Sequence, residues 1–181
     1  MTIQKMVGCD MMMELVFPTI EMKQAALDYR QEHFDRGEKH IHGSAGFNNA
    51  ETYEDWLKQR EEDLTLKDHE RLVAATAYFA MVDGEIVGTI QIRHELNDHL
   101  RHDGGHIGYG VRPSARRKGY ATQMLALALE KCRGLGISKA LVTCDKENIA
   151  SAKTIINNGG VLDSEFINDN GTAAQRYWIS I

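Results

Sequence analysis

The stretch Arg116-Arg117-Lys118-Gly119-Tyr120-Ala121 decides how this chain is interpreted, because it joins a predicted strand directly to a predicted helix. Upstream, residues 106–111 have the strand-like sequence HIGYGV, and Pro113 ends the run because proline cannot donate to a strand ladder. Downstream, apolar residues recur at helical spacing from Ala121 to Cys132. The loop therefore lies at a helix N-terminus, where free backbone N–H groups and the helix dipole favour an anion.

The residue types of this loop suit a phosphate ligand. Gly119 has no Cβ, so an oxygen-rich ligand can approach the backbone, and Arg116, Arg117 and Lys118 bring three positive charges to the same corner. The loop lacks the Gly-Lys-Ser/Thr ending of a Walker loop and the GxGxxG spacing of a dinucleotide loop. A basic helix start that binds nothing is the alternative interpretation of the same residues.

A second segment is also a strand that leads into a helix. Leu141-Val142-Thr143-Cys144 predicts a buried strand, and a helical run from Asn148 to Asn158 ends before Gly159-Gly160. The Arg-x-x-Gly-x-Ala loop after Gly-Val-x-Pro, followed by this Asn-x-x-Ser helix start, resembles the motifs of the GNAT acetyltransferases. Both motifs occur in the order of that family and at about its spacing.

The resemblance implies that acetyl-coenzyme A is the co-substrate. It places Tyr109, Gly110 and Val111 on the strand whose backbone hydrogen-bonds the pantetheine arm, and it places Asn148 beside that arm. The residues that would bind the pyrophosphate, mainly through main-chain amides, are Arg116, Arg117, Lys118, Gly119, Tyr120, Ala121 and Thr122.

The resemblance also implies a mechanism. The parallel strands that carry Gly108 and Val142 are expected to splay apart so that the thioester lies between them, where an amine attacks the acetyl carbonyl and a main-chain amide stabilises the oxyanion. The protonated amine must first lose a proton. The candidate bases are His106, at the start of the Gly108 strand, and Glu95, at the end of the preceding strand. His106 is preferred, because the unperturbed pKa of histidine lies near neutrality. A packing histidine and a solvated loop carboxylate are the alternative interpretations.

One position departs from the family pattern. A tyrosine that protonates the leaving thiolate commonly lies seven residues after the asparagine, and Ile155 occupies that position here. Tyr177, on the last predicted strand, is a distant substitute, although ordinary sheet packing explains it as well. A coenzyme A-binding regulatory module without turnover is therefore kept as an alternative function.

A group of histidines and acidic residues offers a different interpretation, a divalent metal site. The group comprises His94, Glu95, Asp98, His99, His102, Asp103 and His106, all within thirteen residues. The spacing matches none of the metal patterns of histidine-bearing helices or fingers, and a polar loop between strands explains the same residues. We therefore predict no metal site.

The predicted elements follow one another as strand, two helices, three strands, helix, strand, helix and two strands. The segments outside the two motifs are a strand at 14–17, helices at 19–37 and 50–64, strands at 73–82 and 85–94 around an Asp83-Gly84 turn, a polar loop at 97–105, and a closing hairpin of strands 161–167 and 176–181. This order predicts an α+β fold, with a mixed, mostly antiparallel central sheet flanked by helices. It is also the order of the GNAT fold.

Composition limits the class of protein. The length of 181 residues predicts a single domain over 1–181, in which 1–11 are loosely ordered. The net charge of −5 gives no global basic field for nucleic acid or anionic lipid. No apolar run is long enough to cross a bilayer and no secretory pattern is present, so a cytoplasmic protein is expected. Three cysteines are too few for a disulfide framework.

The acceptor is expected to be a primary amine of a small molecule or peptide. By resemblance, its pocket is built by the first two helices, their glycine- and histidine-containing loop, and the closing hairpin. The residues concerned are the loop 39–47, which ends in Phe47, together with Trp56 and the turn 168–171. The resemblance also allows a homodimer, but nothing in the sequence marks an interface.

Overall fold

The computed structural model describes residues 12–66 and 72–181, so the predicted loose segment 1–11 lies outside the described residues. The elements in chain order are β1 (Glu14–Val16), η1 (Ile20–Met22), α1 (Lys23–Asp35), η2 (Phe47–Asn49), α2 (Tyr53–Asp63), β2 (Ala75–Val82), β3 (Glu85–Arg93), α3 (Asp98–His102), β4 (Ile107–Val111), η3 (Pro113–Ala115), α4 (Tyr120–Gly134), β5 (Lys139–Asp145), α5 (Ile149–Asn157), β6 (Val161–Ile167) and β7 (Ala173–Ser180). Every predicted helix and strand within the described residues is present, with ends shifted by a few residues.

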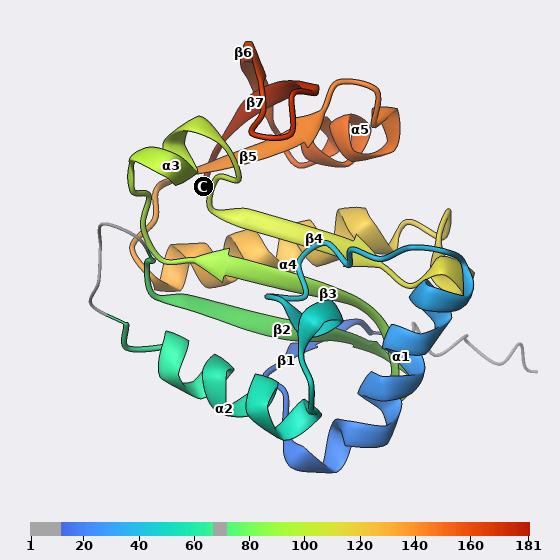
Figure 1. Ribbon diagram of the computed structural model, residues 1–181. Helices are drawn as coiled ribbons and strands as arrows, with labels where there is room; N and C mark the ends of the chain where they lie inside the picture. The colour runs from blue at the N-terminus through green and yellow to red at the C-terminus, as the bar shows by residue number, and fades with distance from the viewer. Residues whose placement is uncertain (1–11, 67–71) are drawn as a thin grey trace, which may run out of the picture.

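The strands form two sheets rather than one continuous sheet. The first has the order β1-β2-β3-β4 and the second β5-β7-β6, and all pairings between these strands are antiparallel. Asp83 and Gly84 both have positive φ angles, 50° and 79°, which is the backbone that a two-residue hairpin turn requires. Figure 1 shows α1 and α2 on one face of the first sheet and α4 on the other.

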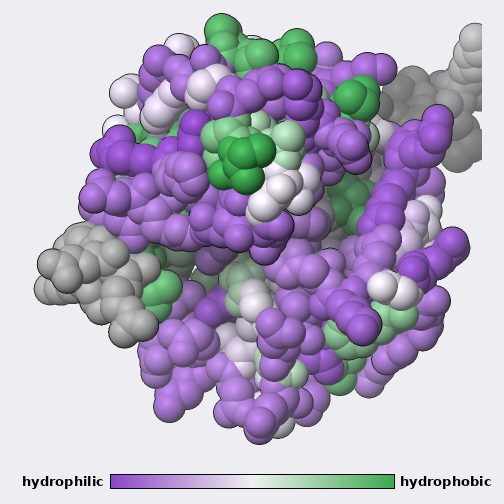
Figure 2. Space-filling model, turned by 45° about the horizontal axis from the view of Figure 1, so that its top comes forward, coloured by the Kyte–Doolittle hydropathy of each residue, from purple (hydrophilic) through white to green (hydrophobic). Residues whose placement is uncertain are grey.

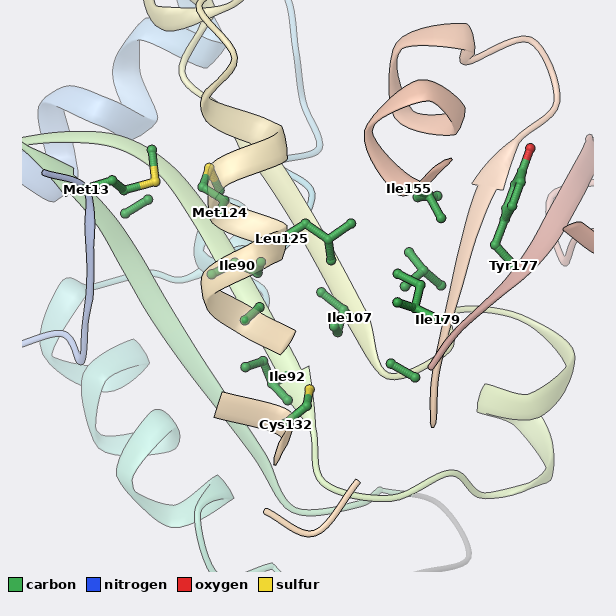
Figure 3. Packing of buried hydrophobic residues seen from close by; sticks show 14 of the residues in the cluster. Met13, Ile90, Ile92, Ile107, Met124, Leu125, Cys132, Ile155, Tyr177 and Ile179 are labelled. Atoms are coloured by element: carbon green, nitrogen blue, oxygen red, sulfur yellow. The ribbon is translucent and has the colours of Figure 1, made fainter. Parts of the chain in front are cut away.

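Two apolar clusters lie on opposite faces of the first sheet. The cluster under α4 joins β3 to that helix, and Figure 3 shows Ile90, Ile92, Met124, Leu125 and Cys132 packed together there. The other cluster lies under α1 and α2 and is rich in aromatic side chains. Its buried members are Ala26, Tyr29, Ile41, Phe47, Tyr53, Trp56, Leu57, Phe79 and Ile86. The sheet is therefore anchored on both faces, which fixes the position of β4 at its edge.

The predicted loop 97–105 contains one element that the sequence pattern did not predict. Residues Asp98–His102 form the short helix α3, and the Asn97 side chain caps it by accepting a hydrogen bond from the Leu100 amide at 2.9 Å. Five residues are too short to show helical periodicity, so only the capping asparagine could have indicated this turn.

The surface is mostly hydrophilic in the view of Figure 2, which brings the end with β6, β7 and α5 forward. Several large apolar side chains are nevertheless exposed on α5 and β6, namely Ile149, Ile156, Val161, Leu162 and Ile167. No helix in the described part of the chain is long and apolar enough to cross a membrane.

Candidate active site

The two sheets meet at a crevice between β4 and β5. The strands touch only at one end, where Gly105 bridges to Val142 and the His106 amide donates to Leu141 O at 2.8 Å. From this closed end the strands diverge, and Figure 1 shows them running apart. The predicted splaying of the two strands is therefore present.

Backbone groups of β4 point into this crevice. The Arg112 amide donates to Val87 O on β3 at 2.8 Å, so even-numbered residues of β4 bond to β3. Consecutive residues of a strand direct their amides to opposite sides, so Ile107, Tyr109 and Val111 direct theirs toward β5. In residues 12–66 and 72–181, β4 pairs only with β3 and forms the edge of its sheet, so these N–H groups have no strand partner. β4 therefore offers a row of unpaired donors along the crevice.

The opposite wall is similar. The Lys146 amide donates to Ala173 O on β7 at 2.9 Å, so even-numbered residues of β5 pair with β7. The N–H and C=O groups of Thr143 therefore face β4 across the crevice. An extended, amide-containing ligand would find hydrogen-bonding groups on both walls.

The glycine loop lies at the N-terminus of α4. Gly119 is the N-cap with a φ of 81°, and Arg117 also has a positive φ of 64°. The first helical hydrogen bond runs from the Gln123 amide to Gly119 O, so the N–H groups of Tyr120, Ala121 and Thr122 precede it. A Cβ on Gly119 would meet no atom within 4 Å. The loop is thus an open cradle of backbone donors, as an anion site requires.

Hydroxyl groups line the α5 side of the crevice. The Tyr109 hydroxyl lies 2.8 Å from Ser151 Oγ, and so links β4 to α5. Asn148 Oδ1 accepts a hydrogen bond from the Ser151 amide at 3.1 Å, which makes Asn148 the N-cap of α5. Burial raises the pKa of Tyr109 to about 12, and the hydrogen bond with Ser151 opposes this effect only in part.

His106 closes the narrow end of the crevice and is only 7% exposed. Its Nδ1 accepts a hydrogen bond from the Leu141 amide at 2.9 Å, so the neutral ring carries its proton on Nε2. Burial, followed by the guanidinium groups of Arg101 and Arg93, lowers the pKa of His106 to about 4. The ring is therefore neutral near pH 7 and fastens β4 to β5.

The other predicted base, Glu95, is close to His106. Both residues line a cavity of about 330 Å³ at the closed end of the crevice, together with Arg101, Lys139 and Trp178. The structure thus brings together the two residues that the sequence suggested for the base. General-base catalysis by either residue remains a prediction, and the Nδ1 contact gives His106 a structural function as well.

The sequence matches the family model described as the Acetyltransferase (GNAT) family over residues 39–155, which is more than half of the chain. The chain belongs to the GNAT acetyltransferases. The matched range contains β4, the glycine loop, β5 and the first residues of α5, which together form the crevice and the cradle. No curated protein matches the sequence.

Solved GNAT structures share the fold at low sequence identity. The α-N-acetyltransferase RimL, which acts on a ribosomal protein and was solved with coenzyme A, is 16% identical with a TM-score of 0.69, covering 96% of this chain and 97% of RimL. The microcin self-immunity acetyltransferase MccE, solved with acetyl-CoA and AMP, is 18% identical with a TM-score of 0.66, covering 93% and 92%. A variant of the spermidine N-acetyltransferase SpeG from Vibrio cholerae is 15% identical with a TM-score of 0.60, covering 93% and 94%.

Two of the basic side chains near the glycine loop already form ion pairs with carboxylates of the protein. Arg116 makes two hydrogen bonds to Glu38, and its Nε donates to Val111 O at 3.1 Å. Arg112 forms an ion pair with Glu32, whose carboxylate also accepts from the Ser114 amide. Sequence reasoning missed both carboxylates, since nothing in their local sequence identifies partners about eighty residues away.

The remaining positive charges of the loop are those of Arg117 and Lys118. Both side chains are exposed, and neither has an ion-pair partner in the described residues. Of the three positive charges that the sequence predicted around one anion, two are therefore free to bind it, whereas Arg116 holds the loop in place through Glu38.

The loop before η2 crosses the other face of β4 at two glycines. A Cβ on Gly43 would lie 2.6 Å from Gly108 O, and a Cβ on Gly110 would lie 2.6 Å from His42 O. The Thr89 hydroxyl also donates to His42 O at 3.1 Å. Only glycine permits such close backbone contact. Figure 1 shows this loop in front of β4, so it borders the crevice on the face opposite α4.

The side chains of this loop divide into two groups. His40 and His42 are exposed, with ring centroids 4.6 Å apart. Phe47 is fully buried, with its ring centroid 4.8 Å from that of Trp56, which is 4% exposed. The expectation that Phe47 and Trp56 line an acceptor pocket is therefore wrong, because both aromatic side chains belong to the core under α1 and α2.

The histidines of the metal alternative do not converge. His94 Nε2 lies 2.8 Å from the Thr76 hydroxyl, His99 lies beside Asp169, and His102 contacts Arg176. In the described residues, no group of three or more histidine, cysteine or acidic side chains is arranged to hold a metal ion.

Proposed function

We propose that this chain is an acetyl-CoA-dependent N-acetyltransferase that acetylates a primary amine of a small molecule or peptide. The observation that carries the proposal is the presence of two sets of backbone donors, one at the N-terminus of α4 after Gly119 and one along the crevice edge of β4 at Ile107, Tyr109 and Val111. A pyrophosphate fits the cradle, and a pantetheine arm, which contains two amides, fits the walls of the crevice. The relatives MccE and RimL were solved with acetyl-CoA and coenzyme A, respectively, which supports this cofactor.

The open arrangement of the site supports direct transfer in a ternary complex. The donor enters the crevice from the cradle, and the acceptor approaches from the face that carries the loop with His40 and His42. The amine nitrogen forms a bond to the acetyl carbon, the carbon–sulfur bond breaks, and its electron pair leaves with the sulfur. An unpaired β4 amide, such as that of Tyr109, stabilises the oxyanion between these steps.

The class of acceptor is supported by the relatives. RimL and SpeG are described as acting on a protein α-amine and on spermidine, so both peptide and small-molecule amines are acceptors within this fold. The amine needs a base, and the two predicted candidates, Glu95 and His106, line one cavity from which either could act directly or through a water. His106 Nδ1 already accepts a hydrogen bond from the Leu141 amide.

The test combines binding with turnover. Isothermal titration with acetyl-CoA measures whether the donor binds, and a panel of polyamines, amino acids and peptides is then screened by release of the coenzyme A thiol. Binding with thiol release and acetylated amine supports the proposal. Binding without turnover for any amine favours the regulatory module, and absence of binding rejects the cofactor assignment.

A further inference from the structure

Thioester aminolysis leaves a thiolate, and a nearby proton donor accelerates its departure. The α5 position at which a tyrosine could donate this proton is occupied by Ile155, which is fully buried. Figure 3 shows its side chain directed into the core beneath α5. Ile155 contributes no hydroxyl, so a proton donor would have to come from another element.

Tyr109 brings a hydroxyl to the same part of the crevice from the opposite wall. Its hydroxyl oxygen lies 2.8 Å from Ser151 Oγ and 3.4 Å from Ser151 O. Ser151 precedes Ile155 by four residues on α5, so the two lie one turn apart on the same face of the helix. The Tyr109 hydroxyl thus lies about one helical turn from Ile155, the α5 position that lacks a proton donor.

We propose that Tyr109 is the general acid that protonates the departing thiolate, an inference that rests on the proposed acetyltransferase function. As the carbon–sulfur bond breaks, the sulfur takes the proton of the Tyr109 hydroxyl. The resulting tyrosinate is reprotonated through solvent by the proton that the amine loses, so the net reaction consumes no acid. Ser151 holds the hydroxyl in position and is a positioning residue.

The surroundings of Tyr109 keep its hydroxyl in the protonated, donor form. Burial raises its pKa to about 12, so the hydroxyl carries its proton throughout the neutral range. The groups that face it are the Ser151 and Thr154 hydroxyls on α5 and the Cys144 thiol on β5, whose pKa is also raised by burial. None of these carries a charge near pH 7, so the proton is donated from a neutral environment.

Tyr177 is the other tyrosine close to this region. Its hydroxyl donates to Gln175 on the same strand at 2.7 Å, and Figure 3 shows the ring directed away from Ile155. Its hydrogen bond is made within β7 and crosses to no other element, whereas the bond of Tyr109 crosses the crevice. The geometry therefore favours Tyr109.

The primary test is Tyr109→Phe, which keeps the ring and removes the hydroxyl. We expect kcat to fall about 10²–10³-fold, while the acetyl-CoA Kd and the acceptor KM change less than about threefold. Tyr78→Phe, on β2, is the matched control and should leave kcat unchanged. Its ring is half-buried and contacts Lys131, away from the crevice.

A second variant separates acid catalysis from packing. Replacing the residue at 109 by a fluorinated tyrosine, whose hydroxyl is more acidic, should restore activity at neutral pH. It should also introduce a fall in kcat at alkaline pH that the parent lacks, because the acid is then deprotonated. A purely structural hydroxyl would not produce this new limb of the pH profile.

The outcomes distinguish this proposal from the function on which it rests. If the parent turns over and Tyr109→Phe retains kcat within about threefold, Tyr109 is not the acid, although the acetyltransferase function stands. If Tyr109→Phe loses acetyl-CoA binding, the hydroxyl serves binding and the acid proposal is overturned. If the parent binds acetyl-CoA but acetylates no amine, the proposed function itself fails, and this inference fails with it.

Discussion

The Arg116 guanidinium and the Glu38 carboxylate form a two-point contact, with N–O distances of 2.6 and 2.7 Å, across 78 residues of sequence. Glu38 follows α1, and Arg116 begins the glycine loop. The second Glu38 oxygen also lies 2.7 Å from His33 Nδ1, so that nitrogen carries the proton that is shared with the carboxylate. The hydrogen bond from Arg116 holds the pKa of Glu38 at about 2. The N-terminal helix is thereby tied directly to the cradle.

Glu38→Gln tests whether the Arg116–Glu38 ion pair positions the cradle. The amide cannot form the charge-assisted pair, so we expect a loss of roughly 1 kcal/mol of stability, limited by the partial exposure of both groups. Coenzyme A affinity should fall about three- to tenfold in titration calorimetry, because Arg116 no longer fixes the loop.

Glu130→Gln is the matched control, because Glu130 pairs with Arg133 on the exposed surface of α4. It should leave coenzyme A affinity unchanged. An unchanged affinity in Glu38→Gln as well would show that the pair stabilises the fold without positioning the loop.

His106 predicts a dependence of stability on pH. Its pKa is lowered from 6.5 to about 4 in the folded chain, so between these values the unfolded chain binds a proton that the folded chain does not. The free energy of unfolding should therefore rise with pH from about 4 to 6.5, by at most on the order of 3 kcal/mol. Urea unfolding at a series of pH values measures this slope, and it should be smaller in His106→Asn.

The same variant distinguishes a structural function of His106 from general-base catalysis. The asparagine side-chain oxygen can replace Nδ1 as acceptor for the Leu141 amide, but it does not titrate. We expect His106→Asn to retain kcat within about threefold near pH 7, and His106→Phe to lose stability. A fall of about 10²-fold or more in kcat for His106→Asn, with a changed pH–rate profile, would instead establish His106 as the base.

The sequence was sufficient to predict the cradle and the order of elements, because these depend on local patterns. Gly119 between a strand and an amphipathic helix predicts a loop at a helix N-terminus, and Gly119 is indeed the N-cap of α4. Phe47 shows the limit of such reasoning. It lies in a glycine-rich loop, yet it is completely buried against Trp56, in a cluster that includes the distant residue Phe79. The Arg116–Glu38 pair was likewise not predictable, since charge pattern alone does not specify a distant partner.

The loop that crosses β4 makes a prediction for acceptor binding. His42 is exposed where this loop borders the crevice, with its main-chain oxygen held by Thr89. We expect His42→Ala to raise the acceptor KM about three- to tenfold while the acetyl-CoA Kd is unchanged. Steady-state kinetics with the best amine of the screen measures this. Lys58→Ala, on the exposed surface of α2, serves as the control. Equal acceptor kinetics in both variants would place the acceptor elsewhere.

Gly119→Asp tests the cradle itself, and Gly136 provides a control at the opposite end of α4. Both glycines have positive φ angles, 81° and 77°, and a Cβ on either would meet no atom within 4 Å. The two substitutions to Asp therefore carry a similar backbone strain, of about 1–2 kcal/mol. Only the aspartate at 119 places a negative charge where a pyrophosphate would lie.

Coenzyme A affinity should consequently fall about 100-fold or more in Gly119→Asp and remain near the parent value in Gly136→Asp. Titration calorimetry measures the affinity, and thermal unfolding shows that both variants are folded. Gly119→Ala adds a Cβ without charge and should have an intermediate effect. If Gly119→Asp binds coenzyme A as tightly as the parent, the phosphate is bound away from this loop, and the assignment of the cradle to the pyrophosphate is wrong.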